Sequence, residues 1–150
     1  MMKIIRNNRL EEIKRIEHLL YGINYEVWLN LYGIIDPDLS IQDALRQIVS
    51  KDAVVSGVLS SSVKKAKKEI MRCLLYEGDL GHGPIKLEKK RNEIIELIGR
   101  IFTLTDIDNA EIISEFGFRE GHPAEPVFWD FAFDIDSIKK RWIFIGSSSD

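Results

Sequence analysis

The sequence contains one cysteine, Cys73, among its 150 residues. A single cysteine provides neither an intramolecular disulfide nor a cysteine-based zinc site, which is typical of a protein from a reducing compartment. The sequence also lacks an apolar run long enough to span a bilayer. Charged residues follow the basic N-terminal stretch, where an export signal would be apolar. The sequence therefore predicts a cytoplasmic protein without a membrane partner.

The chain has no strong excess of positive charge. Its formal net charge is −3 and its pI is near 5.7, whereas a dedicated nucleic-acid-binding protein needs a basic surface to neutralise phosphates. The charge is also uneven, because residues 103–150 contain ten acidic and four basic side chains, whereas residues 1–102 contain fourteen and seventeen. An acidic C-terminal region of this kind would attract a basic partner.

The composition, 45% hydrophobic and 30% charged, predicts a single globular domain over residues 1–150. Apolar residues recur at helical spacing through most of the first two-thirds, which predicts a helical region over residues 8–115. Cap-forming residues, glycines and prolines place the expected helices at about 8–22, 24–33, 40–48, 63–77, 84–102 and 105–113.

Aromatic and β-branched residues dominate after Gly117 and predict a β region over residues 116–146. We expect a short strand near 116–119, then a hairpin of 127–135 and 141–146, with residues 147–150 as a frayed tail. The predicted fold class is α+β, with a mostly helical N-terminal two-thirds packed on a C-terminal antiparallel β-hairpin or three-stranded meander.

The segment VFWDFAFDID, residues 127–136, alternates between apolar and acidic residues. Side chains of a strand alternate between its two faces, so Val127, Trp129, Phe131, Phe133 and Ile135 share one face, and Phe128, Asp130, Ala132, Asp134 and Asp136 share the other. The aromatic face is predicted to be core, because each buried aromatic ring removes about 150 to 250 Å² from water. The second face is acidic.

The partner strand is apolar on both faces, so two registers fit the pattern. In one register Trp142 and Phe144 lie beside Asp130 and Asp134, and in the other Ile143 and Ile145 lie there. In either case something should cover the acidic face of the sheet. A helix of the chain itself is one candidate, and the alternative is an exposed aromatic patch with a rim of carboxylates, typical of a protein-binding surface.

The hypothesis for function is a non-catalytic protein-binding module, of the kind that neutralises a toxin or nuclease as an immunity or antitoxin-type inhibitor. Its expected partner is a basic protein, and a second copy of the chain is an alternative partner. No cofactor, no metal site and no catalytic residue is predicted. The predicted partner-binding residues are Asp130, Asp134, Asp136, Trp142 and Phe144.

Residues 52–72 support an alternative hypothesis of DNA binding. The spacing of Ala53, Gly57 and Val63 resembles that of a helix-turn-helix motif. The following helix would present Lys64, Lys65, Lys68 and Arg72 to nucleic acid. Its first turns hold no Arg, Asn or Gln to read bases, so these lysines would contact phosphates without sequence preference.

A second alternative is a metal-dependent nuclease or other hydrolase that uses Asp134 and Asp136 with Lys139 or Lys140. Their spacing matches no established motif. His82 and His122 occur in glycine-containing loops, and we expect turn or capping roles for both. Cys73 is predicted to lie within a helix rather than in a nucleophile setting.

Overall fold

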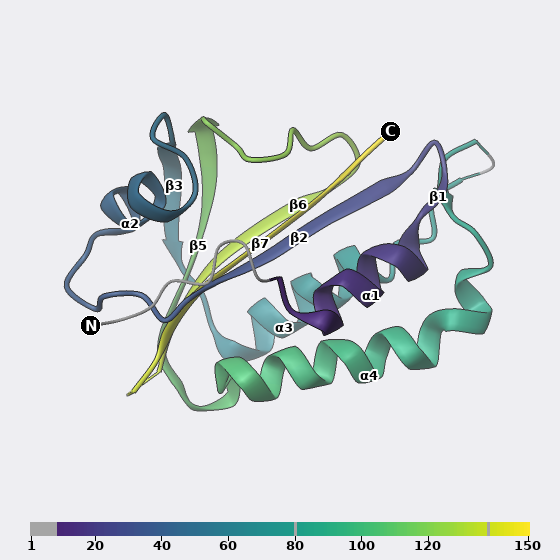
Figure 1. Ribbon diagram of the computed structural model, residues 1–150. Helices are drawn as coiled ribbons and strands as arrows, with labels where there is room; N and C mark the ends of the chain where they lie inside the picture. The colour runs from purple at the N-terminus through teal and green to yellow at the C-terminus, as the bar shows by residue number, and fades with distance from the viewer. Residues whose placement is uncertain (1–8, 80, 138) are drawn as a thin grey trace.

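The computed structural model describes residues 9–79, 81–137 and 139–150, and its fold is α+β (Figure 1). A five-stranded antiparallel sheet forms its centre, and helices lie on both faces of the sheet. The elements follow in the order α1 (Glu11–Leu20), β1 (Gly22–Ile23), β2 (Glu26–Gly33), α2 (Ile41–Ile48), β3 (Val54–Ser60), α3 (Val63–Leu74), β4 (Gly83–Pro84), α4 (Leu87–Thr105), the 3-10 turn η1 (Ile107–Asn109), β5 (Ala110–Glu120), β6 (Asp130–Ser137) and β7 (Arg141–Ser149).

The strand order in the sheet is β2-β7-β6-β5-β3, and every neighbouring pair is antiparallel. The short strands β1 and β4 form a separate two-stranded ladder. The predicted C-terminal hairpin is therefore confirmed as β6 and β7. Both are interior strands of a larger sheet, because β7 lies between β2 and β6, and β6 lies between β7 and β5.

Helices α1, α3 and α4 cover one face of the sheet, here called the helix-covered face, and bury the larger core against it. As the alternation predicts, Trp129, Phe131, Phe133 and Ile135 of the β6 region belong to this core. Val127, predicted to lie on the same face, precedes β6 and is exposed. The opposite face, here called the α2 face, carries the smaller core, in which Ala44, Leu45 and Ile48 pack on the sheet. Both faces of the central strands are thus buried within the chain.

The prediction of a mostly helical N-terminal two-thirds is wrong, because residues 26–33 and 54–60 are strands. In β2, Val27, Leu29 and Leu31 face the helices, and Tyr32 packs in the smaller core on the opposite face. A strand with two buried faces shows no alternation of polar and apolar residues, and its apolar run also fits helical spacing. Residues 110–113, predicted as helix, are likewise the start of β5.

The predictions are confirmed for helices that keep one side exposed to solvent. Helix α2 begins after Ser40, whose hydroxyl accepts a hydrogen bond from the Asp43 amide at 3.1 Å. Helix α3 begins after Ser62, which accepts from the Lys65 amide in the same way. Pro84 does not begin α4, however, because it pairs with Gly22 in the small ladder. Residue 8, where the first helix was expected to begin, lies outside the described residues.

The C-terminal residues are part of the sheet. Ser147 and Ser148 are 1% and 0% exposed, and β7 pairs with β2 as far as Ser149. The expected frayed tail over residues 147–150 is therefore an error for 147–149. Serines at the end of a chain are typical of a flexible tail, but here the small side chains of Ser147 and Ser148 are packed in the interior.

Candidate protein-binding site

The predicted aromatic patch is buried. Trp142 and Phe144 are 5% and 1% exposed, because the second register holds and pairs them with Ile135 and Phe133 on the helix-covered face. Ile143 and Ile145 lie on the α2 face and are also fully buried. Neither aromatic side chain of β7 is available to a partner on the surface of the folded chain.

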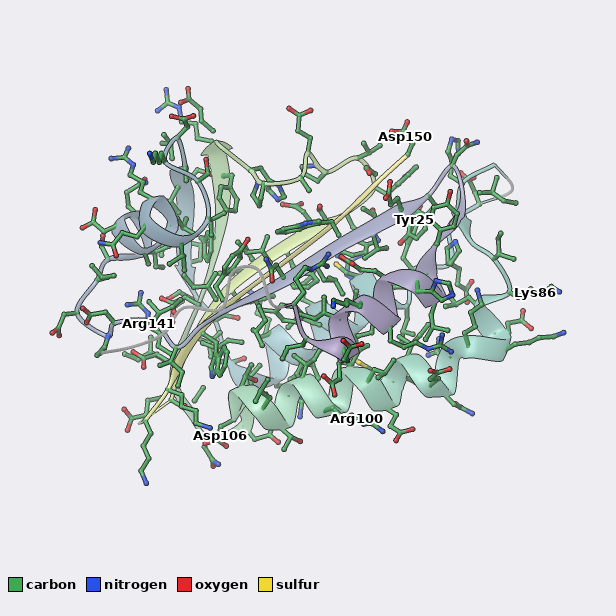
Figure 2. All side chains as sticks on the ribbon, in the orientation of Figure 1. Tyr25, Lys86, Arg100, Asp106, Arg141 and Asp150 are labelled. Atoms are coloured by element: carbon green, nitrogen blue, oxygen red, sulfur yellow. The ribbon has the colours of Figure 1, made fainter. Side chains whose placement is uncertain are left out.

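Asp134 is buried as well, as the partner of Arg141. The Arg141 guanidinium donates to both Asp134 carboxylate oxygens, at 3.0 and 2.9 Å. Its Nη1 also donates to the carbonyl oxygens of Asp36 and Leu39, at 2.8 and 2.7 Å. Arg141 therefore ties the connection between β2 and α2 to the sheet, at the opposite end from Tyr25 (Figure 2). Asp134 has a structural role.

The other two predicted acids differ in their exposure. Asp130 is exposed at the start of β6, whereas Asp136 is half-buried near its end. Burial raises the pKa of Asp136, and the nearby Asp134 carboxylate raises it further. Of the five predicted partner-binding residues, Asp130 is thus the one that is fully accessible.

The sheet opens beside Asp130. Strands β5 and β6 pair from Ala110 and Ser137 as far as Glu115 and Phe133. Beyond that point β5 continues against β3, and β6 continues against β7. Figure 1 shows the two strands diverging, with the loop of residues 121–129 spanning the opening. The β5–β6 ladder therefore ends at Glu115 and Phe133.

A cavity of about 240 Å³ lies at this opening and is here called the acidic cavity. It is lined by Gly57, Leu59, Glu69, Glu115, Phe116, Asp130, Phe131, Ala132 and Phe133. Three of these residues are carboxylates and none is basic. Glu69 and Glu115 each contact one cation of α3, Arg72 at 3.1 Å and Lys65 at 3.4 Å, whereas Asp130 has no ion pair among the described residues.

His122 lies near this opening. Its ring contacts Phe118 and Trp28, with ring centroids 4.8 and 6.5 Å apart. Its Nδ1 accepts a hydrogen bond from the Ala124 amide at 2.9 Å, so the ring stabilises the turn of its own loop. Burial lowers the pKa of His122, and the Asp130 carboxylate opposes that shift. The imidazole is thus favoured in its neutral form.

The remaining candidates show structural roles. The Asp79 carboxylate accepts from the amides of Gly81 and His82, and His82 Nδ1 lies 3.4 Å from the same oxygen. Cys73 is fully buried in α3, and burial raises the pKa of its thiol to about 12. A thiol that stays protonated at neutral pH is a poor nucleophile.

Residues 52–72 do not form a helix-turn-helix, because residues 54–60 are the strand β3 and only α3 is helical. Of the predicted DNA-contacting residues on α3, Lys65 and Arg72 pair with Glu115 and Glu69. Lys64 and Lys68 are exposed. The bases on the exposed side of α3 therefore lie beside two carboxylates, Glu69 of the helix and Glu115 of β5.

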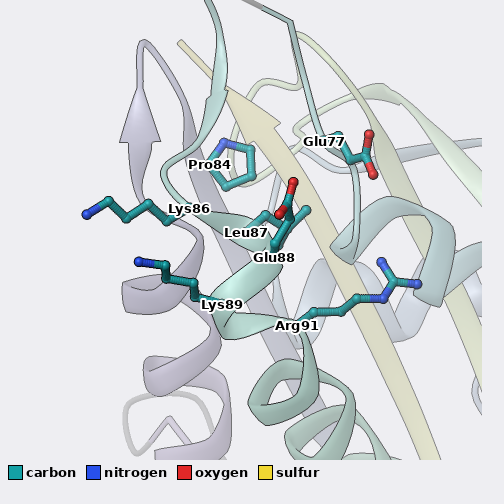
Figure 3. A pocket seen from close by; sticks show the side chains of 7 residues that line it. All are labelled: Glu77, Pro84, Lys86, Leu87, Glu88, Lys89 and Arg91. Atoms are coloured by element: carbon teal, nitrogen blue, oxygen red, sulfur yellow. The ribbon is translucent and has the colours of Figure 1, made fainter.

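A larger cavity of about 520 Å³ lies at the start of α4 (Figure 3). It is lined by Glu77, Pro84, Lys86, Leu87, Glu88, Lys89 and Arg91. Figure 3 shows Lys86 and Lys89 pointing to the side opposite Arg91, so the three cations do not converge on one point. For this reason the smaller acidic cavity, whose charges share one sign, is the better candidate site.

Comparison with known protein families, with curated proteins and with solved structures finds no match to this chain. Within the described part of the chain, no group of three His, Cys, Asp or Glu side chains is placed to hold a metal ion. No helix in that part is both long and apolar enough to cross a bilayer.

The sequence contained one signal for this site that periodicity does not detect. Residues 53–63 hold no charged side chain, although 30% of all residues are charged. This stretch contains β3, whose residues from Ser56 to Ser60 are exposed. Two large apolar side chains of this charge-free stretch, Val58 and Leu59, are exposed.

Proposed function

We propose that the protein is a cytoplasmic, non-catalytic protein-binding module that binds a basic partner at the acidic cavity. The observation that carries this proposal is the set of three carboxylates, from Glu69, Glu115 and Asp130, around a cavity without a basic lining residue. Such a lining attracts a lysine or arginine side chain and disfavours acidic ones.

The physical setting strengthens this attraction. The cavity wall includes Phe131 and Phe133, which are almost fully buried, so the carboxylates lie beside low-dielectric material. Charges interact more strongly there than in bulk water. The acidic balance of residues 103–150 adds a longer-range attraction that increases the association rate with a basic protein.

The class of partner that fits is a protein with an exposed basic surface, such as a nuclease or toxin that holds phosphate there. An acidic module would occupy that phosphate site and inhibit its partner, which is the immunity or antitoxin type of role. This role predicts inhibition that weakens as salt is added, because exposed charges are screened within about 8 Å at physiological ionic strength.

The direct test is an NMR titration with arginine amide and with citrulline amide, its neutral isostere. Arginine amide is expected to shift the amide signals of residues that line the acidic cavity. Asp130→Asn and Glu115→Gln should each weaken its binding by about twofold to fivefold, the range for an exposed ion pair. The control is Asp38→Asn, which removes an exposed acid outside the cavity lining.

Equal shifts from the two amides, or shifts remote from the cavity, would show that the cavity does not select cations. The protein-level test uses the wild-type chain and an Asp130→Arg, Glu115→Arg double variant as paired baits in host extract. The expected result is a basic protein that the wild type retains at low salt and the charge-reversed variant does not. Retention of that protein by both baits would contradict the proposal.

A further inference from the structure

Strand β2 is the outer strand at one edge of the sheet, and its outer edge is occupied by side chains. The amide of Leu29 donates to the Glu17 carboxylate at 2.7 Å, and its carbonyl accepts from Arg9 Nη2 at 2.6 Å. Arg9 and Glu17 also form an ion pair with each other. At Leu29 these side chains take the place of a neighbouring strand and disfavour pairing with another chain.

The first half of β3, the outer strand at the opposite edge, is occupied in a similar way. The Gln42 amide group of α2 donates to the Ala53 carbonyl at 2.6 Å and accepts from the Val55 amide at 2.9 Å. Arg46 donates to the same carbonyl at 3.1 Å. A single side chain thus makes the two hydrogen bonds that a paired strand would make here.

The second half of β3, Ser56–Ser60, is here called the free edge. Among the described residues, no side chain or strand bonds to its outer side. Val58 and Leu59 are 48% and 60% exposed, although both are large and apolar. A β-bulge between Ser56 and Leu59, where Gly57 adopts a φ of 56°, bends the free edge, so an added strand has to follow this bend. An uncharged, uncovered edge strand is a template for pairing with another chain.

The free edge adjoins the acidic cavity, because Gly57 and Leu59 line that cavity. An extended segment that pairs with the free edge has side chains pointing alternately to the two faces of the sheet. Every second side chain therefore lies on the face from which Glu69 and Glu115 approach. An added strand lies two strand spacings, about 10 Å, from β5, so a basic side chain at such a position has to extend over Leu59 to approach Glu115 and Glu69. Main-chain hydrogen bonds would hold the segment in register.

We propose that the partner binds as an added β-strand: an extended segment pairs with Ser56–Ser60 and places one arginine or lysine side chain in the acidic cavity. This inference rests on the proposed function and specifies the partner segment, which is extended, uncharged at its edge-contacting positions and basic at one position facing the cavity. Charge complementarity selects this occupant over an acidic or a neutral strand.

The test uses one synthetic peptide, acetyl-Thr-Val-Thr-Arg-Thr-Val-Thr-amide, in four forms. The first is unmodified and the second carries citrulline in place of arginine. The other two carry N-methyl groups on alternate amides, one on the odd and one on the even positions. Only one of these two sets can face β3, so one N-methylated form serves as the control for the other.

The unmodified peptide is expected to shift the amide signals of Ser56–Ser60 and of the cavity residues. Because it loses two or three main-chain hydrogen bonds, one N-methylated form should bind about tenfold or more weakly than the unmodified peptide. The other N-methylated form should bind within about twofold of the unmodified peptide, because its free amides still face the strand.

Each outcome addresses one of the two proposals. If both N-methylated forms bind as the unmodified peptide does, added-strand binding is refuted while cation binding stands. If citrulline and arginine peptides bind equally, the proposed function fails. If the unmodified peptide shifts no signal although arginine amide does, added-strand binding is also refuted.

A protein variant provides an independent check. Val58→Lys places a cation on the free edge. It should weaken binding of the arginine peptide by about tenfold, through charge repulsion and the loss of apolar contact. The matched control is Ile112→Lys on β5, where the side chain is 60% exposed but lies off the outer edge. If light scattering instead shows a dimer that Val58→Lys disrupts, the occupant is a second copy and the proposal is overturned.

Discussion

Arg141 and Asp134 form a two-bond ion pair across the β6–β7 hairpin, with side chains only 6% and 11% exposed. Arg141 also holds the carbonyls of Asp36 and Leu39, so the pair links three segments. Asp134→Ala leaves the guanidinium buried without its carboxylate. We expect it to lower the free energy of unfolding by about 3 to 5 kcal/mol, as measured by urea denaturation.

The control for that variant is Asp38→Ala, which removes an exposed carboxylate that has no ion pair among the described residues. It should change the free energy of unfolding by about 0.5 kcal/mol or less. An Asp134→Ala protein as stable as the Asp38→Ala protein would show that the buried pair contributes nothing to the fold.

Asp136 offers a prediction about pH. Its folded-state pKa lies above the ordinary value of 3.8, first because of burial and then because of Asp134. The folded state therefore binds the Asp136 proton more tightly than the unfolded state does. Protonation of Asp136 stabilises the fold, and this stabilisation is lost as pH rises through the folded-state pKa. Asp136→Asn should thus unfold at a higher temperature than the wild type at pH 7, with the difference disappearing as pH falls below 3.8. A variant less stable than the wild type at pH 7 would contradict this.

His122 predicts the opposite pH dependence. Its folded-state pKa lies below 6.5, so the unfolded state takes up a proton first as pH falls, and stability present above pH 6.5 is lost on acidification. The negative charges of Asp130 and Glu125 oppose this lowering of the pKa and so limit the loss. The His122→Gln variant lacks this titrating group. Its melting temperature should therefore decrease less between pH 7.5 and pH 5 than that of the wild type. Parallel profiles for the two proteins would refute the assignment.

The sequence was sufficient for the elements that keep one wet face. Helices α2 and α3 were located by their serine caps and apolar stripes. The alternation also separated the two faces of β6, although both faces of that strand are largely buried. The sequence was insufficient for β2, because burial on both faces erases alternation, and for β3, because Gly57 and two serines interrupt any apolar period.

The register of the hairpin was the main obstacle for the candidate site. Apolar residues on both faces of β7 fit either register, and the choice between them decides whether Trp142 is core or surface. In the register of the structure, Ile143 and Ile145 belong to the core on the α2 face, and the aromatic rings belong to the core under the longer helices. Likewise, the departure of β5 from β6 after Glu115 depends on a tertiary pairing with β3 that no local pattern encodes.

Trp129 Nε1 donates to the Tyr25 hydroxyl at 2.7 Å inside the larger core, and burial raises the pKa of Tyr25 to about 12. Tyr25→Phe would leave the indole N–H without this acceptor, and should cost about 1 to 3 kcal/mol in urea denaturation. Tyr76→Phe is the matched control, because Tyr76 stacks on Tyr25 but is only half-buried. Equal losses in the two variants would indicate that the hydroxyl of Tyr25 adds nothing specific.

The last residues of the chain should be essential for stability. Ser148 accepts main-chain hydrogen bonds from Val127 and Phe128, and its hydroxyl accepts from the Trp129 amide at 3.2 Å. Deleting residues 147–150 removes these bonds and the pairing with Val27 and Trp28. With about 1 kcal/mol for each lost hydrogen bond, the expected loss is at least about 3 kcal/mol by urea denaturation. Deleting Asp150 alone should change stability by about 0.5 kcal/mol or less, because β7 ends at Ser149. If the longer deletion were equally harmless, the end of β7 would have no role in holding the sheet together.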